Sequence, residues 1–581
     1  MNTDLSNWIA AYKEREDLAP FGSAGLALFA MALKFGYVEL STIGADAVVD
    51  GPDDKGCDVV YVDLDQRRAI IAQSYRAETP KVAASDAKAA TLRQGASYLL
   101  EIQRDQVPER IRPAAQSLRD AIQTGSIDSI HVWFVHNCPG SENVKREVSA
   151  VEQSIKSIVS ARFNPRIDVF AEEISSETLS KLYNDTNTPI LVNKTVEFER
   201  NHALEFSEGE WDCVVLPMKL RLLRELYINH KTDLFSANVR DFLGVKSGDS
   251  NINYQMQKSL SERPENFFVY NNGLTILTHA IKKDDPSKII VNGLSIVNGA
   301  QTTGTIGTSK ELPPEDAFVL VRFISTTNED LIADVVRYNN SQNSVTASDF
   351  RSTDPIQRRL VSEMQNIPDA EYDGGRRGGV SAAIKRRPKL LPSYSVGQAL
   401  ASFHGTPATA YNEKSAIWSR DALYSRFFNE NLSAQHIVFV FSLLRSIEEE
   451  KNRLRELETK QSQLAAADSA KLAFYRKRGS VFLLAGAIGE CLETILDKVV
   501  ANRFSVSFGV KTSPNDAMEL WKDTVSALSG LHTHLEKALN DGLKNQETVA
   551  ETLKSFSQLV ASLRVPYSSF FDVIKGKAVI G

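Results

Sequence analysis

Two polar side chains lie at one end of a predicted β-hairpin, and their types suit metal binding. The first strand covers residues 55–62 and carries Asp58 near its start, and the second covers residues 69–76 and carries Gln73 near its end. Because the strands of a hairpin run in opposite directions, the two side chains are expected at the same end. Carboxylate and amide oxygens are ligands that Mg²⁺ accepts. Taken alone, Asp58 is better explained as an acid in a surface turn, and Gln73 together with the fold pattern makes the metal site an equal alternative.

The hairpin resembles the active centre of PD-(D/E)xK nucleases, with one departure. In that class an Asp on one strand and an acid or Gln on the next hold the metal, and a Lys two residues further on steadies the attacking water or the charge on the phosphate. The resemblance implies Asp58 and Gln73 as metal ligands and catalytic residues, with Mg²⁺ or Mn²⁺ as the cofactor. Tyr75 stands at the lysine position. Lys81, the residue we assign to catalysis, or Lys88 could reach back into the site, or the site could be inactive.

Other candidate ligands surround the hairpin. Glu39, Asp46 and Asp50 precede it, and Asp46 is preferred as a third metal ligand because a helix or loop before the first strand often supplies one in such nucleases. His131 and His136 are five residues apart on one predicted strand, so their side chains face opposite sides. They are interpreted as core or edge histidines.

Strands and helices alternate after the hairpin. This alternation predicts an α/β sheet covered on both faces, and we assign residues 1–190 to a restriction-endonuclease-like domain. The predicted helices cover residues 83–102, 108–124, 141–160 and 176–183, and the predicted strands cover residues 129–136 and 166–170.

An amide-rich constellation marks the middle of the chain. Three Asn-Gly steps interrupt short apolar runs there, a pattern typical of strands joined by tight turns. Amide side chains both donate and accept hydrogen bonds without charge, so the cluster also suits recognition of a base edge, a sugar or a phosphate ester. Both interpretations stay open. The candidate ligand-binding residues are Asn271, Asn272, Asn298, Gln301, Thr302, Asn339 and Gln342.

Four ordered phrases in this region resemble the AIPR family, which is named for abortive phage infection proteins of bacteria. The resemblance implies phage defence without specifying a biochemical activity. We assign residues 191–412 to an α+β AIPR-like core. The phrases are NVRDFLG (238–244), FFVYNNGLTIL (267–277), IVNGAQTTG (296–304) and RYNNSQNSVTASDF (337–350).

A basic strip closes this core. Residues 374–412 contain no Asp or Glu, whereas Arg376, Arg377, Arg386 and Arg387 all lie in it. Guanidinium groups suit bidentate contacts with phosphate, so the strip is a candidate nucleic-acid contact. A solvated basic face explains the pattern equally well.

Residues 413–581 are predicted to be helical, which makes the whole chain an α/β multidomain protein with a helical C-terminal region. Leucines and isoleucines at heptad-like spacing in residues 435–464 predict a short coiled-coil-like arm. Residues 481–499, 514–539 and 545–563 are predicted bundle helices. Packing or homo-oligomerisation is their simplest role.

Composition and charge exclude several kinds of protein. The 581 residues carry a formal net charge of −6, so no overall positive field attracts nucleic acid or membrane. Four scattered cysteines without a CxxC pair argue against a zinc knuckle and a disulfide scaffold. The opening residues are acidic and no apolar run is long enough to span a bilayer. The chain is expected to be cytoplasmic, with no membrane partner.

Three functions are compatible with these patterns. The first is an antiphage nuclease whose hairpin cuts nucleic acid under control of the AIPR-like core. The second is a sensor or adaptor that kept the fold but lost the metal site, binding a nucleotide or nucleic acid and signalling to partner defence proteins. The third is a scaffold that assembles a defence complex through its helical region.

Overall fold

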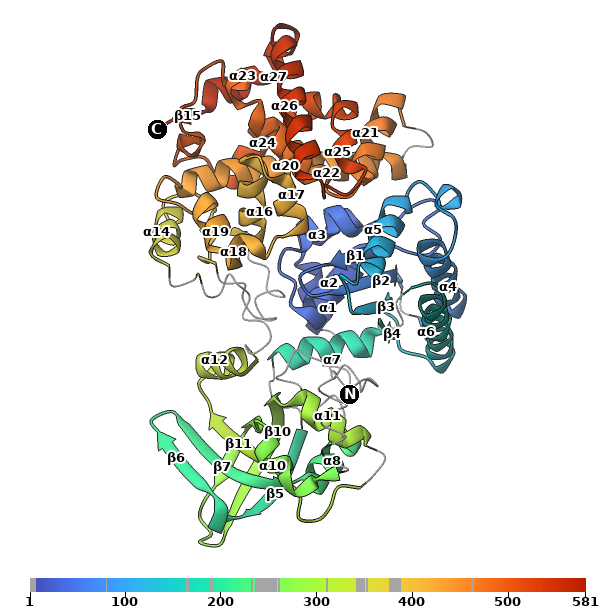
Figure 1. Cartoon of the computed structure of the whole chain (residues 1–581), viewed down its shortest axis with the longest axis vertical. Coiled ribbons are helices and arrows are strands. Elements are labelled where there is room, and N and C mark those ends of the chain that lie inside the picture. Colours follow the sequence, from blue (N-terminus) through green and yellow to red (C-terminus); the bar gives the residue numbers. More distant parts are fainter. Residues whose placement is uncertain are drawn as a thin grey trace.

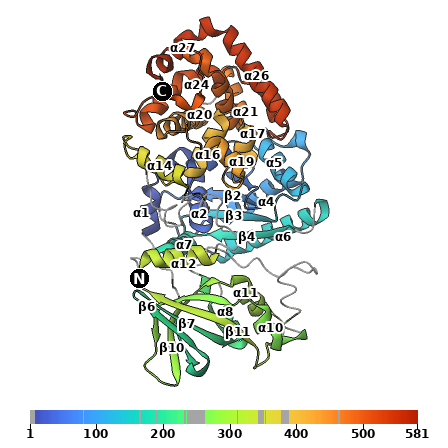
Figure 2. The same cartoon turned by 60° about the vertical axis from the view of Figure 1, so that its left-hand side comes forward.

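The computed structural model describes residues 7–79, 81–163, 167–187, 190, 192–230, 234–235, 259, 262–309, 312–340, 351, 354–375, 388–460 and 464–581. These residues form three bodies arranged along the long axis (Figures 1 and 2). An α/β body lies in the middle, a sheet-rich body at one end and a helical body at the other. Among the described residues, no helix combines the length and apolarity needed to cross a membrane.

The middle body contains a four-stranded sheet in the order β1-β2-β3-β4. The first two strands form the expected antiparallel hairpin, and β2, β3 and β4 run parallel. Val60 and Ile71 point to one face and Val59 and Ile70 to the other, and all four are buried. The strands are β1 (Val59–Asp63), β2 (Arg68–Tyr75), β3 (Ser129–His136) and β4 (Asp168–Ile174).

Helices cover both faces of this sheet, as expected for parallel strands that are apolar on both sides. On one face lie α4 (Asp86–Leu100), α5 (Arg112–Gln123) and α6 (Glu142–Arg162), with η2 (Arg104–Gln106) between the first two. On the other face lie α1 (Asn7–Lys13), η1 (Glu16–Phe21), α2 (Ala24–Phe35), α3 (Leu40–Ala47) and α7 (Ser176–Asn187).

The sheet-rich body has seven strands in the order β5-β10-β8-β11-β7-β6, with β9 pairing β10. Helices α8 (Leu220–His230) and α11 (Ala300–Thr308) pack on one face, and α12 (Glu329–Asn340) packs on the other. The remaining elements are β5 (Val192–Glu199), η3 (Arg200–His202), β6 (Leu204–Glu208), β7 (Trp211–Lys219), η5 (Pro264–Asn266), α10 (Phe267–Tyr270), β8 (Leu274–Thr278), β9 (Ala280–Lys282), β10 (Lys288–Asn298) and β11 (Phe318–Thr326).

The three Asn-Gly steps do not form the hairpin turns that the sequence predicted. Gly273 precedes β8, Gly293 lies at an irregularity within β10, and Gly299 precedes the first turn of α11. All three glycines have positive φ, between 79° and 100°, so the conformational requirement was correct although the turn type was not. At Gly293 a Cβ would lie 2.2 Å from the His279 ring.

The helical body has one large apolar core that begins at Leu360, so the last part of the expected 191–412 domain packs with the C-terminal helices. Two short strand pairs, β12 with β13 and β14 with β15, border it. Its elements are α14 (Pro355–Met364), β12 (Glu371–Tyr372), β13 (Leu390–Leu391), α16 (Ser393–Phe403), α17 (Pro407–Asn412), α18 (Ala416–Ser419), α19 (Asp421–Phe427), α20 (Ala434–Lys460), α21 (Ala466–Arg476), α22 (Ser480–Glu490), α23 (Leu492–Leu496), η6 (Arg503–Ser505), β14 (Val506–Ser507), α24 (Pro514–Ser529), η7 (His532–His534), α25 (Glu536–Leu539), α26 (Gln546–Ser562), α27 (Arg564–Lys577) and β15 (Val579–Ile580).

Helix α20 is the central helix of this body rather than a coiled-coil-like arm. It packs against α16, α22 and α24, and most of residues 434–447 are buried. The Trp521 indole of α24 donates a hydrogen bond to the carbonyl oxygen of Phe439 at 3.1 Å. The heptad-like spacing therefore reflects a helix that is buried on several sides.

A buried histidine pair predicts that the helical body loses stability in acid. The His436 ring bonds to the carbonyl oxygen of Val506 at 2.7 Å, and its other nitrogen lies 3.0 Å from Nε2 of His404. Burial lowers the pKa of both rings, that of His436 to about 4. A histidine in the unfolded chain has a pKa near 6.5, which is higher than the pKa of either ring in the folded protein. Between the folded and unfolded pKa values, the unfolded chain therefore binds more protons than the folded protein. Stability should be fully present above about pH 6.5 and fall toward pH 4, by about 1.4 kcal/mol per pH unit for each proton.

Thermal unfolding followed by circular dichroism from pH 7.5 to 4.5 measures this effect. A His404→Gln, His436→Gln double variant should show a shallower fall of Tm with pH than wild type. His534→Gln, which changes an exposed histidine of η7, is the control and should keep the wild-type slope. Equal slopes in all three proteins would contradict the prediction.

Candidate metal centre

Asp58 and Gln73 meet at one end of the β1–β2 hairpin. Continuing the register of Val59 with Ala72 by one residue sets Asp58 opposite Gln73, and the amide of Asp58 donates to the carbonyl oxygen of Ala72 at 2.9 Å. Both side chains are buried. One carboxylate oxygen of Asp58 accepts a hydrogen bond from the Ser74 amide at 2.6 Å. The hairpin thus brings together the two residues that the sequence pattern selected.

The Gln73 side chain contacts Thr91 of α4, whose hydroxyl lies 3.2 Å from Oε1 of the amide. The Thr91 hydroxyl has one proton, which it can donate to the carbonyl oxygen of Lys88 at 2.7 Å. The same hydroxyl accepts from Nε2 of Gln73 at 2.9 Å. The Gln73 amide oxygen and the carbonyl oxygen of Lys88 therefore compete for the single proton of this hydroxyl.

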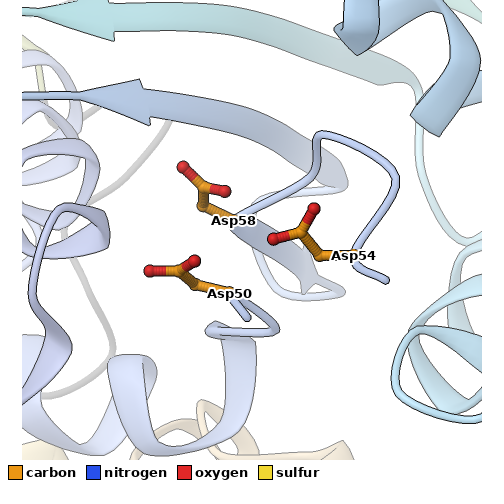
Figure 3. A group of neighbouring side chains, drawn as sticks. All are labelled: Asp50, Asp54 and Asp58. Atoms are coloured by element: carbon orange, nitrogen blue, oxygen red, sulfur yellow. The ribbon is translucent and has the colours of Figure 1, made fainter. Parts of the chain in front are cut away.

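Two further carboxylates join Asp58. The side chains of Asp50, Asp54 and Asp58 each place an oxygen within 4.8 Å of the others, and Figure 3 shows them converging from the loop between α3 and β1. The loop is closed by a backbone bridge between Val48 and Val59. Three carboxylates form a set of hard oxygen ligands that fits Mg²⁺ or Mn²⁺.

Backbone amides orient the Asp54 carboxylate. Its two oxygens accept hydrogen bonds from the amides of Gly51 and Gly56, at 3.0 and 2.8 Å. Gly56 has φ +82°, and a Cβ there would lie 2.7 Å from Oγ1 of Thr91. A glycine is therefore required where the loop passes α4.

The carboxylates lack full charge compensation. Burial, followed by the charges of Asp50 and Asp54, raises the pKa of Asp58 well above its ordinary value, and the nearby Lys88 only partly opposes this. Burial and then Asp54 likewise raise the pKa of Asp50. A bound divalent cation would remove this mutual repulsion, which is the electrostatic condition expected of a metal centre.

Lys81 and Lys88 lie beside Tyr75, the residue that stands at the expected lysine position. Tyr75 lies two residues after Gln73 on β2, so the two side chains share a face of the sheet. The ammonium group of Lys81 donates to the Tyr75 hydroxyl, and that of Lys88 lies 4.5 Å from the centre of its ring. Lys88 projects from α4 and its charge also acts on Asp58. Both lysines proposed from the sequence therefore lie near the position of the missing one.

Asp46 does not join the metal centre, which corrects its assignment as the third ligand. Its carboxylate accepts a hydrogen bond at 2.9 Å from Arg478 of the helical body. The Arg478 guanidinium also donates to the carbonyl oxygen of Val60 at 2.7 Å. Asp46 lies at an interface between bodies, and Asp50 and Asp54 take the place expected for it.

The amide constellation divides into two groups. The Asn271 side chain donates to the Thr302 hydroxyl at 3.1 Å and accepts from the Gly273 amide at 2.9 Å. Asn272 and Gln301 are exposed beside this pair. The first group therefore lies where the segment after α10 meets the first turn of α11.

The second group lies between β8, β10, β11 and α12. Asn339 of α12 accepts hydrogen bonds from the Thr275 hydroxyl, at 3.1 Å, and from Arg322. Asn298 pairs with Thr275 across the sheet. Sequence reasoning missed Arg322 because only strand pairing places it beside Thr275. Gln342, Arg376, Arg377, Arg386 and Arg387 lie outside the described residues.

Comparison with known proteins adds one finding. Residues 235–452 match the family model for AIPR protein. No curated protein and no solved structure matches the chain. The match supports the resemblance to the AIPR family and is consistent with a role in abortive infection. The AIPR segment covers β8 to β11 and continues into the helical body as far as α20, whereas the metal centre lies before it.

Proposed function

We propose that the chain is an antiphage nuclease that depends on a divalent metal ion and carries its active centre at the β1–β2 hairpin. The observation that carries the proposal is the convergence of Asp50, Asp54 and Asp58 opposite Gln73, on the sheet face that Lys88 also reaches. The mixed sheet with helices on both faces supports a restriction-endonuclease-like domain. The AIPR segment supports the role in phage defence.

Each residue has a defined task in this proposal. Asp50, Asp54, Asp58 and the Gln73 amide would hold Mg²⁺ or Mn²⁺, which supplies a polarised phosphate oxygen and a water of lowered pKa. Lys88 partly balances the charge of Asp58 and would contact a phosphate oxygen of nucleic acid. The Asn298, Arg322 and Asn339 group and the basic strip would contact the nucleic acid or a signal. The helical body would serve homo-oligomerisation or contacts with other defence proteins.

The cellular test is phage plating on cells that express the full-length chain. Protection by wild type should be lost in Asp58→Asn and kept in Asp105→Asn, which changes an exposed acid of η2 in the same body. Protein levels are compared by immunoblot. Full protection by Asp58→Asn would refute the nuclease proposal.

A sensor or adaptor remains the second candidate because Tyr75 stands at the lysine position. In that case nucleic acid or nucleotides would bind at the amide groups without being cut. Isothermal titration with nucleotides and short duplexes distinguishes the two, since binding without any cleavage in Mg²⁺ or Mn²⁺ would favour the sensor.

Replacement of Lys88 and replacement of Lys81 should lower the rate of cleavage to different extents. Lys88→Met should lower cleavage by about tenfold or more, because Lys88 is the cation that acts on Asp58. Lys81→Met should lower it less, because Lys81 donates to the Tyr75 hydroxyl. Lys156→Met, at an exposed position of α6 that pairs with Glu152, should retain wild-type cleavage. A larger loss in Lys81→Met than in Lys88→Met would reverse the assignment.

A further inference from the structure

Helix α20 connects the AIPR segment with the loop of the metal centre. It runs without interruption from Ala434 to Lys460, beginning inside residues 235–452 and ending beyond them. Near its end, the Glu458 carboxylate accepts a hydrogen bond of 2.5 Å from Arg110, which precedes α5. The two side chains are only 25% and 10% exposed. This contact joins residues 348 positions apart and spans the two bodies.

Arg110 in turn holds the backbone that carries Asp50. Its Nη1 donates to the carbonyl oxygen of Asp50 and its Nε to that of Pro52, both at 2.9 Å. Gly51 between them has φ +139°, and a Cβ there would lie 2.6 Å from Nη1 of Arg110. The guanidinium therefore fits against the loop backbone itself, where a side chain on residue 51 would displace it.

Glu458 is also fixed from the helical side. Nη2 of Arg476, at the end of α21, lies 2.7 and 2.6 Å from its two oxygens. Burial alone would raise the pKa of Glu458, but the hydrogen bonds and charges of Arg476 and Arg110 lower it below its ordinary value. Glu458 is thus held between Arg110 of the middle body and Arg476 of the helical body.

We propose that Arg110 and Glu458 are positioning residues that let the helical body set the geometry of the metal centre. Arg110 transmits the position of α20 to the loop, and the loop carries Asp50 and Asp54. A movement of the AIPR segment, which includes the first part of α20, would then change metal affinity without any contact between that segment and the metal. This inference rests on the proposed metal-dependent activity.

Titration of the full-length protein with Mn²⁺ alone tests the inference. Glu458→Ala should raise the Kd for Mn²⁺ by about tenfold, the scale seen when residues that orient metal ligands are lost. Glu458→Gln keeps the shape and one acceptor, so it should show a smaller rise and remains informative if Glu458→Ala unfolds. Glu456→Ala is the matched control, since Glu456 lies on the same helix, is 63% exposed and pairs with Lys460.

The dependence of the cleavage rate on Mn²⁺ concentration distinguishes weaker metal binding from loss of folding. Glu458→Ala should cut slowly at low Mn²⁺ and approach the wild-type rate at saturating Mn²⁺. Wild-type affinity in both Glu458 variants, with wild type binding Mn²⁺ normally, would overturn this inference and leave the proposed function standing. Absence of Mn²⁺ binding by wild type would overturn both.

Discussion

Asp58→Asn is expected to abolish metal-dependent cleavage of nucleic acid while making the metal-free protein no less stable. Changes in residues that only orient metal ligands weaken metal sites about 10- to 100-fold, so replacing a ligand should lower the rate by at least about a hundredfold. The fold should survive because an asparagine oxygen can still accept the hydrogen bond from Ser74. The change also removes a buried charge that Asp50 and Asp54 repel.

The measurement uses purified full-length protein with Mg²⁺ or Mn²⁺, and with EDTA as the metal-free control. Single- and double-stranded DNA and RNA are compared, which also identifies the substrate class. Asp105→Asn should cut as wild type does, and Tm without metal should be equal or higher in Asp58→Asn. Wild-type cleavage by Asp58→Asn would move the active centre elsewhere.

Arg478→Met is expected to lower the free energy of unfolding by about 3 kcal/mol, because breaking a buried charged contact leaves its partner uncompensated. Arg478 is 8% exposed, and it bonds both the Asp46 carboxylate and the carbonyl oxygen of Val60. Val60 belongs to β1, so the arginine joins the helical body to the sheet that carries the metal centre.

Urea unfolding monitored by circular dichroism measures this loss. Arg420→Met is the matched control, since Arg420 is 65% exposed and pairs with Glu413 on the surface of the same body. Arg420→Met should lower the free energy of unfolding by no more than about 1 kcal/mol, the range for exposed ion pairs. Equal losses in the two variants would show that the Arg478 contact contributes no more than a surface pair.

Local patterns predicted the elements around the metal centre better than they predicted the centre itself. The largely apolar runs were sufficient to place β2 within one residue at each end and β3 at its observed limits. The convergence of Asp50 and Asp54 on Asp58 depends on loop closure, with positive φ at Asp53, Lys55 and Gly56. Propensity does not predict such a path, and Asp46 was preferred only by analogy with nucleases in which a helix or loop before the first strand supplies a ligand.

Long-range contacts account for the other differences between the structure and what the sequence predicted. Asp46 meets Arg478 across 432 positions, and no local pattern indicates that pairing. The amide residues were treated as one group, but the topology β10-β8-β11 divides them and adds Arg322. The expected boundary at residue 412 was based on composition, whereas the helical core already begins at Leu360.

Binding of Mn²⁺ to the full-length protein, measured by isothermal titration for wild type, Asp58→Asn and Asp105→Asn, tests the metal centre most directly because it needs neither a substrate nor a phage trigger. The proposed metal centre predicts saturable binding of Mn²⁺ by wild type and Asp105→Asn, and loss of this binding in Asp58→Asn. Equal binding by all three proteins, or none by wild type, would contradict it.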